Sequence, residues 1–208
     1  MKQLEIRSIN TEFTADSESR TIHGLAIPVN SRSALLGGEF YETISPDAIT
    51  TDFLQTQDIK LYLDHDASHG TYARSKFGQG TLNLTITERG LEFDTEVPNT
   101  VFGDALLEGI RRGDYDAISF AFIPDDDQWS KNEDNTLNRM INSFRMLDEI
   151  SILSQLPAYE ATSIDIRSLN DFKHEEEERK QHEAELIAKL DGIVAELDEN
   201  CKKIFVKY

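Results

Sequence analysis

The stretch Asp116-Ala117-Ile118-Ser119-Phe120-Ala121-Phe122 predicts a short β-strand in the second half of the chain. Side chains alternate between the two faces of a strand. The large apolar residues share one face: Ile118, Phe120 and Phe122. The small residues share the other: Ala117, Ser119 and Ala121. Another chain could therefore approach the Ser119 hydroxyl closely, although a serine between alanines is usually a packing residue.

Two other segments make Ser119 a candidate nucleophile. One is Leu61-Tyr62-Leu63-Asp64-His65-Asp66, and the other is Leu147-Asp148-Glu149-Ile150-Ser151. Serine attacks at neutral pH only when a base takes its proton, and that base needs a third group to fix its tautomer. His65, Ser119 and Glu149 each lie in a predicted strand or at its end, where a rigid scaffold can hold side chains in reach of one another. Spacing alone does not show that they meet, because a chain of this size contains many such triples.

Other interpretations of these residues stay open on the pattern alone. His65, flanked by Asp64 and Asp66, is compatible with a surface histidine held by its neighbours. Together with His69 they form a weaker candidate for a metal cluster, since no further Cys or His completes a four-ligand set. Glu149 is compatible with a solvated strand residue. No pair of carboxylates stands out for glycosidase chemistry and no Gly-rich phosphate loop is present, so we expect neither a cofactor nor a metal.

The composition favours a soluble protein of cytosolic type. The 208 residues are enough for one well-cored domain with an appendage, and the net charge of −18 argues against a nucleic-acid groove or an anionic membrane surface. The single Cys201 excludes an internal disulfide and fits a reducing compartment. No apolar stretch is long enough to span a bilayer, and the N-terminal residues lack the apolar core of a signal peptide. We therefore expect no nucleic-acid or membrane partner.

The hydrophobic pattern predicts a mainly β domain with a few helices. In the opening strand, Leu4 and Ile6 alternate with charged and polar residues. Gly24 lies inside the second strand and indicates a bulge or a close backbone approach. Strands are expected at 4–9, 21–29, 40–44, 59–63, 82–86, 91–97, 117–122, 144–153 and 164–166.

Turn and capping residues mark the helices and connections. A brief helix is expected from Ser45 as N-cap to about Leu54, and a longer one from Thr100 as N-cap to Gly113. Residues 88–90 form the turn of a predicted hairpin. The acidic segment 124–137 is poor in aliphatic residues and predicts a mobile surface loop or a hairpin tip.

The composition changes sharply at Asp171. Glu175–Glu178 is an acidic run, and apolar residues at helical spacing follow it: Leu186, Ile187, Leu190, Ile193, Val194, Leu197, Ile204 and Phe205. Such a helix cannot bury its apolar stripe by itself, so it must pack on the domain, on a second copy or on a partner. We therefore predict two domains, 1–170 and 171–208, the second being an acidic amphipathic helix.

Several segments match a known family in their order and separation. They are Ile22-His23-Gly24-Leu25-Ala26, Phe40-Tyr41-Glu42-Thr43-Ile44-Ser45-Pro46-Asp47-Ala48, Leu63-Asp64-His65-Asp66, Ile118-Ser119-Phe120-Ala121-Phe122, and Leu147-Asp148-Glu149-Ile150-Ser151-Ile152-Leu153 with Pro157-Ala158-Tyr159. Through these segments, over roughly residues 4–168, the chain resembles the prohead proteases of tailed phages, the group that is similar to herpesvirus assemblin.

The resemblance implies a serine endopeptidase of the immature capsid, with a closed, mostly antiparallel β-barrel as its fold. It would cut scaffold and capsid-protein segments, and then itself, inside assembling proheads in the host cytoplasm. His65 matches the histidine of the family, Ser119 its nucleophile and Glu149 its acidic position. Asp148 is the alternative acid, although adjacent strand residues face opposite ways, so only one of the two can face the histidine. Ala121 stands where a glycine commonly precedes the last Phe, and 47–49 reads Asp-Ala-Ile where the family often has Gly-Ala-Phe.

Two functional classes remain to be distinguished. The tail resembles scaffold-like helical extensions, so we expect it to co-assemble with scaffold helices or with a second copy of the chain. The alternative to a protease is a non-enzymatic assembly module that uses the barrel and the tail only for interaction. The sequence does not identify the donors of an oxyanion hole, for which backbone N–H groups are the default candidates.

Overall fold

The computed structural model describes residues 3–11, 13–16, 18–132, 136–155, 173–174 and 176–194. The chain divides into two compact units, Met1–Asp165 and Ile166–Tyr208, and each is described here by itself. No helix among the described residues is both long and apolar enough to cross a membrane.

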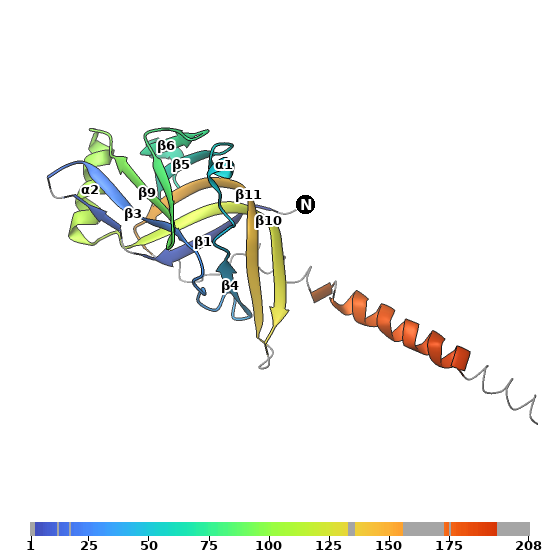
Figure 1. Cartoon of the computed structure of the whole chain (residues 1–208). Helices are drawn as coiled ribbons and strands as arrows, with labels where there is room; N and C mark the ends of the chain where they lie inside the picture. Colours follow the sequence, from blue (N-terminus) through green and yellow to red (C-terminus); the bar gives the residue numbers. More distant parts are fainter. Residues whose placement is uncertain are drawn as a thin grey trace, which may run out of the picture. The chain divides into compact units, whose positions relative to one another are not determined.

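The first unit contains a seven-stranded sheet built around a long hairpin (Figure 1). Its ladder runs in the order β1 (Glu5–Asn10), β10 (Ala117–Lys131), β11 (Leu137–Leu153), β5 (Asp58–Leu63), β6 (Ala73–Lys76) and β7 (Gln79–Gly80). β4 (Phe40–Ile44) pairs with the part of β11 nearest the hairpin tip. β4 and β5 run parallel to β11, and the other pairs in this sheet are antiparallel.

A second sheet of four antiparallel strands faces the first. Its order is β2 (Phe13–Ala15), β3 (Thr21–Pro28), β9 (Gly90–Glu96) and β8 (Asn83–Thr87). The helices of this unit are α1 (Thr51–Leu54), the 3₁₀ helix η1 (Ala67–His69) and α2 (Val101–Arg112). Both sheets and α2 contribute to one hydrophobic core, whose buried members include Ile22, Leu91, Leu106, Ile118 and Ile150.

The predicted mainly β fold is confirmed, but the predicted closed barrel is not what the structure shows. The described strands form two separate sheets, and neither closes on itself. The chain leaves the first sheet after Asn10 and begins the second at Phe13, so β1 and β2 are edges of different sheets. The opposite edge of the first sheet is β7, which has only two residues and pairs with β6. The core is therefore enclosed by two stacked sheets rather than by one continuous ladder.

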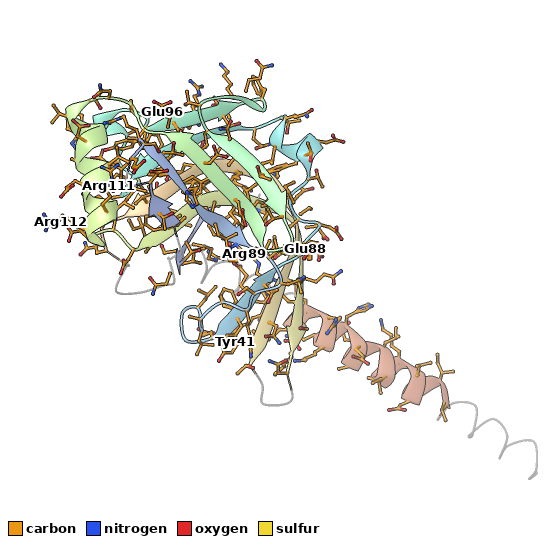
Figure 2. The ribbon with its side chains drawn as sticks, turned by 60° about the vertical axis from the view of Figure 1, so that its left-hand side comes forward. Tyr41, Glu88, Arg89, Glu96, Arg111 and Arg112 are labelled. Carbon is orange, nitrogen blue, oxygen red and sulfur yellow. The ribbon has the colours of Figure 1, made fainter. Side chains whose placement is uncertain are left out.

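Local signals in the sequence predicted α2 and the β8–β9 hairpin correctly. The Thr100 hydroxyl caps α2 by accepting a hydrogen bond from the Gly103 N–H at 3.1 Å. Gly113 ends the helix in the left-handed conformation, with φ of 75°. Figure 2 shows two basic residues, Arg111 and Arg112, at the C-terminal end of α2, where cations are favoured by the helix dipole.

Gly24 is a place of close backbone approach, as predicted. A Cβ at this position would lie 2.3 Å from the Cβ of Phe13 on the neighbouring β2. The ladder between β3 and β9 also shifts register between Leu25 and Ile27. Only a residue without a side chain lets β2 approach β3 this closely.

The helix predicted to begin at Ser45 begins later. The main-chain N–H of Ser45 still binds Ile141 O of β11 at 2.9 Å, and its hydroxyl accepts a bond from the Asp47 N–H across a turn. Thr50 is the true N-cap of α1 and accepts from the Phe53 N–H at 3.1 Å. The serine therefore stabilises a turn after β4 instead of a helix start.

The acidic segment predicted as a loop is mostly strand. Residues 124–131 continue β10 and residues 137–143 begin β11, so the segment forms the two arms of a hairpin that extends from the rest of the unit (Figure 1). Paired backbone and the contact with β4 order these arms despite their polar sequence. Of the two predicted alternatives, the hairpin is confirmed.

The second unit contains an α-helix over residues 176–194. The apolar positions that the structure describes on this helix are 52–63% exposed: Leu186, Ile187, Leu190, Ile193 and Val194. The strand predicted at 164–166, the last apolar positions of the tail and the boundary at Asn170 lie outside the described residues. The division into domains 1–170 and 171–208 therefore stays a prediction.

Candidate active site

Ser119 lies on β10, between β1 and β11, on the face of the strand that points away from the core. The alternation predicted for this strand is confirmed, because Ile118, Phe120 and Phe122 all belong to the hydrophobic core. Ser119 pairs with Ser8 of β1 on one side and with Ser151 of β11 on the other. Directly paired residues project to the same face of a sheet, so three serines lie side by side. Ser119 has no solvent-exposed surface.

His65 reaches Ser119 from a tight turn that follows β5. Asp64 and His65 have φ of 53° and 59°, and the Asp66 N–H binds Leu63 O at 3.0 Å, as in a two-residue turn of the primed type. Asp tolerates positive φ better than most residues. The Asp64 carboxylate also accepts bonds from the N–H and the hydroxyl of Ser154, at 2.8 and 2.7 Å. The end of β11 thereby holds the turn and aims the imidazole.

Glu149, and not Asp148, is the acid that binds His65. The register between β10 and β11 skips Asp148, which is the extra residue of a β-bulge. Leu147 and Ile150 on either side are both buried in the core, so the simple alternation that set the two acids on opposite faces does not hold here. Glu149 Oε1 is hydrogen-bonded to His65 Nδ1. Asp148 accepts instead from Lys60 Nζ at 2.9 Å.

The three predicted residues thus form one hydrogen-bonded set, which we call the triad. His65 Nε2 lies 2.8 Å from Ser119 Oγ, while Nδ1 faces Glu149. When the neutral imidazole donates Nδ1–H to the carboxylate, its Nε2 lone pair is free to accept the serine proton. The triad can therefore act as nucleophile, base and orienting acid.

The Ser119 hydroxyl has further partners on β1, which sequence reasoning missed. Its Oγ lies 2.9 Å from the main-chain carbonyl oxygen of Arg7, and it accepts a bond from the Ser8 hydroxyl at 3.3 Å. A hydroxyl carries a single proton, so Ser119 donates to either Arg7 O or His65 Nε2 at any moment. Nothing in the sequence of β1 marks these contacts, because they depend on its register with β10.

A family model described as Caudovirus prohead serine protease matches residues 2–178, which is most of the chain. The chain belongs to this family. The family resemblance inferred from the sequence is thereby confirmed, and the chain is a serine peptidase. The protease is also similar to the solved structure of the bacteriophage T4 capsid assembly protease, gp21, with 13% identity and a TM-score of 0.43 over 73% of this chain and 97% of that one. A likeness this distant carries no argument about function. No curated protein matches the sequence.

The residues of the alternative metal cluster have other partners in the protease. Asp66 accepts bonds from the N–H and the hydroxyl of Ser68 and so caps η1. The His69 ring lies against the ring of Phe102, with 4.6 Å between their centroids. Backbone hydrogen bonding from Ser68 lowers the pKa of Asp66 below its ordinary value. These contacts order the loop after His65. The imidazole of His65 is itself hydrogen-bonded to Glu149 and Ser119.

The protease also buries an ionic cluster that the sequence did not reveal. Arg7 binds both carboxylate oxygens of Glu42 and one of Glu5, each at 2.7 Å. Arg139 binds both oxygens of Glu5, at 2.6 and 3.0 Å, together with Glu42 and Asp127. Within β1, Glu5 and Arg7 are buried and Ile6 is only partly buried, so the charged residues of this strand face the interior.

The ionic cluster fixes β1 beside Ser119. It joins β1 to β4 and β11, and Arg7 belongs to it through its side chain while its carbonyl oxygen contacts Ser119. Burial alone would raise the pKa of Glu42, but the charges of Arg7 and Arg139 outweigh it and hold this pKa below its ordinary value. Glu42 therefore remains an anion that anchors both guanidinium groups.

Proposed function

We propose that this protease hydrolyses peptide bonds with Ser119 as nucleophile, His65 as general base and Glu149 as the group that orients His65. The observation that supports this most directly is the continuous hydrogen bonding from Ser119 Oγ through His65 to Glu149. Asp64 adds support, because its bonds to Ser154 hold the turn that carries the base. Positioning of this kind is what converts an ordinary serine into a nucleophile.

The proposed reaction proceeds in two acyl-transfer steps. Ser119 Oγ attacks the scissile carbonyl carbon while its proton moves to His65 Nε2, and the π electrons of the carbonyl move onto its oxygen. Collapse of this tetrahedral intermediate breaks the C–N bond, and the leaving amine takes the proton from Nε2. Water then attacks the acyl ester by the same route and restores the Ser119 hydroxyl. Glu149 stabilises the imidazolium that forms in each step.

The proposed substrates are scaffold and capsid-protein segments inside the assembling prohead, in the cytoplasm of the host, followed by the protease itself. Family membership supports this role. We further propose that residues 171–208 act as a separate, scaffold-like domain. Its exposed apolar stripe suits packing against scaffold helices or a second copy of the chain. If a chain truncated after Asn170 entered proheads as efficiently as the full chain, the role of the tail would be wrong.

The proposal is tested by incubating wild-type protein and Ser119→Ala with a purified capsid precursor and reading the products by mass spectrometry. Loss of a triad member typically costs on the order of 10⁴- to 10⁶-fold in kcat. Ser130→Ala is a matched control, because Ser130 is an exposed serine on the same strand. Equal cleavage by Ser119→Ala and wild type would remove Ser119 as the nucleophile. A wild-type chain that neither cleaves the precursor nor reacts with a fluorophosphonate would favour a non-enzymatic assembly module.

A further inference from the structure

Acyl transfer at Ser119 needs a hydrogen-bond donor for the oxyanion, and the backbone of β10 next to Ser119 is already paired on both sides. β10 pairs in unbroken register with both β1 and β11 through Ala117–Ala121. In a strand paired on both sides, the main-chain N–H groups bind the neighbouring strands. The described backbone donors on either side of Ser119 are therefore engaged in the sheet, which favours a side-chain donor.

Ser8 is placed where such a donor is required. In the strand order β1-β10-β11-β5, His65 and Glu149 approach Ser119 from the side of β5 and β11, whereas Ser8 approaches from β1. Its hydroxyl already donates to Ser119 Oγ at 3.3 Å. Donors for an oxyanion must lie on the side of the nucleophile away from the base, since the base occupies the other side.

The route by which a substrate carbonyl can reach Ser119 also favours Ser8 as the donor. Ser119 has no exposed surface, so a substrate carbonyl can reach it only when a neighbouring group moves aside. Among the described residues, the side chains bonded to Ser119 Oγ are those of His65 and Ser8, and both are partly exposed. A carbonyl that enters between them meets the base on one side and the Ser8 hydroxyl on the other.

Ser151 is the counterpart of Ser8 on the other side of Ser119. It is the register partner of Ser119 on β11, just as Ser8 is on β1, and it is also a fully buried serine. Its hydroxyl has no hydrogen-bond partner among the described residues and lies on the strand that carries Glu149. Of the two serines beside the nucleophile, only Ser8 therefore combines a bond to Ser119 with a position opposite His65.

We infer that Ser8 is a further catalytic residue, whose hydroxyl donates a hydrogen bond to the oxyanion of the tetrahedral intermediate. This inference rests on the proposed function of Ser119. When the Oγ–C bond forms and the carbonyl electron pair moves onto oxygen, the Ser8 proton turns from Ser119 Oγ to that oxygen, without leaving Ser8. No proton is transferred in this contact, so His65 remains the only base in the step.

The buried ionic cluster holds this donor in place. Ser8 follows Arg7, whose guanidinium is fixed by Glu5 and Glu42 at 2.7 Å. β1 is an edge strand, which would otherwise be free to shift away from β10. A donor acts without reorganisation during the reaction only when its scaffold is rigid. The ionic cluster thus holds Ser8 on β1 in place, as the bonds of Asp64 hold the turn that carries His65.

The test compares Ser8→Ala and Ser8→Thr with wild type and with Ser130→Ala as the surface control. We measure kcat and KM on the capsid precursor, and the rate at which a fluorophosphonate labels Ser119, followed by intact mass. Removing one oxyanion donor typically lowers kcat by about 10²- to 10³-fold. Ser8→Ala should show this loss in kcat and a slower labelling rate, with little change in KM or thermal midpoint.

Ser8→Thr keeps the hydroxyl and should recover most of the lost rate. Wild-type rates in Ser8→Ala would overturn the inference. So would equally slow rates in Ser8→Ala and Ser8→Thr with unchanged thermal midpoints, because the hydroxyl would then not be the active group. These outcomes are distinct from failure of the proposed function, which would appear as full cleavage by Ser119→Ala.

Discussion

Replacing Arg139 by Met would break the buried ionic cluster while nearly keeping the volume of the side chain. Arg139 is 2% exposed and binds Glu5, Glu42 and Asp127. Without it, Arg7 would be the one guanidinium left in the cluster to face these carboxylates. Removing one partner from a buried ion pair typically costs about 3–5 kcal/mol, because the remaining charges stay buried. For a unit of this size that cost corresponds to a fall of roughly 6–20 °C in thermal midpoint.

Calorimetry at neutral pH would measure this fall, and the chain offers a matched control. Arg74 also binds a carboxylate through two nitrogens, with Nε 2.6 Å from Asp58 Oδ1 and Nη2 2.5 Å from Asp58 Oδ2, but its side chain is 47% exposed. An exposed pair of this kind is screened by solvent and contributes little to stability, so Arg74→Met should lower the thermal midpoint far less.

Equal falls in the two variants would refute the reasoning, because the larger cost expected for Arg139→Met comes from leaving several carboxylates buried without their partner. A second readout ties the cluster to the active site. Below its thermal midpoint, Arg139→Met should still lose cleavage rate, since a loosened β1 no longer holds Ser8 and Arg7 O against Ser119. A destabilised variant with wild-type rates would restrict the cluster to a structural role.

Three further variants or conditions test other parts of the structure. Asp64→Ala should lower the cleavage rate about 10- to 100-fold by releasing the turn that aims His65, and initial rates equal to wild type would contradict this. Gly24→Ala should destabilise the domain by about 1–3 kcal/mol in urea titrations, because its Cβ would meet Phe13 at 2.3 Å. Since the folded pKa of Glu42 is lowered, its contribution is complete above the ordinary value of about 4.3 and is lost as pH falls through the folded pKa. Acidification below about pH 4 should therefore lower the thermal midpoint, more steeply in wild type than in Glu42→Gln.

The sequence predicted those features that depend on neighbouring residues. The alternation around Ser119 and the capping of α2 by Thr100 need only local rules, and the structure follows both. The candidate triad came from the ordered family segments, because no local rule brings His65 and Glu149 to the same serine. These rules consider only neighbouring residues, so they wrongly predicted a helix start at Ser45. There, a hydrogen bond to a distant residue of β11 prevents the helix from beginning.

The features that escaped prediction depend on contacts between distant residues. Nothing in the local sequence marks Glu5 and Arg7 as buried, because their partners lie 35 to 134 residues away on β4 and β11. The bulge at Asp148 is visible only when β11 is set against β10. Whether a sheet closes into a barrel likewise depends on which edge strands pair, and no pattern within a single strand determines this pairing.

The first strand belongs to the candidate active site as much as the strand that carries Ser119. Of the three groups in the described part of the chain that are hydrogen-bonded to Ser119 Oγ, two come from β1 and one from the turn after β5. The Arg7 carbonyl competes with His65 for the single proton of Ser119, at distances of 2.9 and 2.8 Å, so the position of β1 affects how often that proton points to the base. The charges of Arg7 fix this position through partners on the opposite face of the sheet. Arg7 therefore helps to set the geometry of the hydroxyl that we propose as the nucleophile.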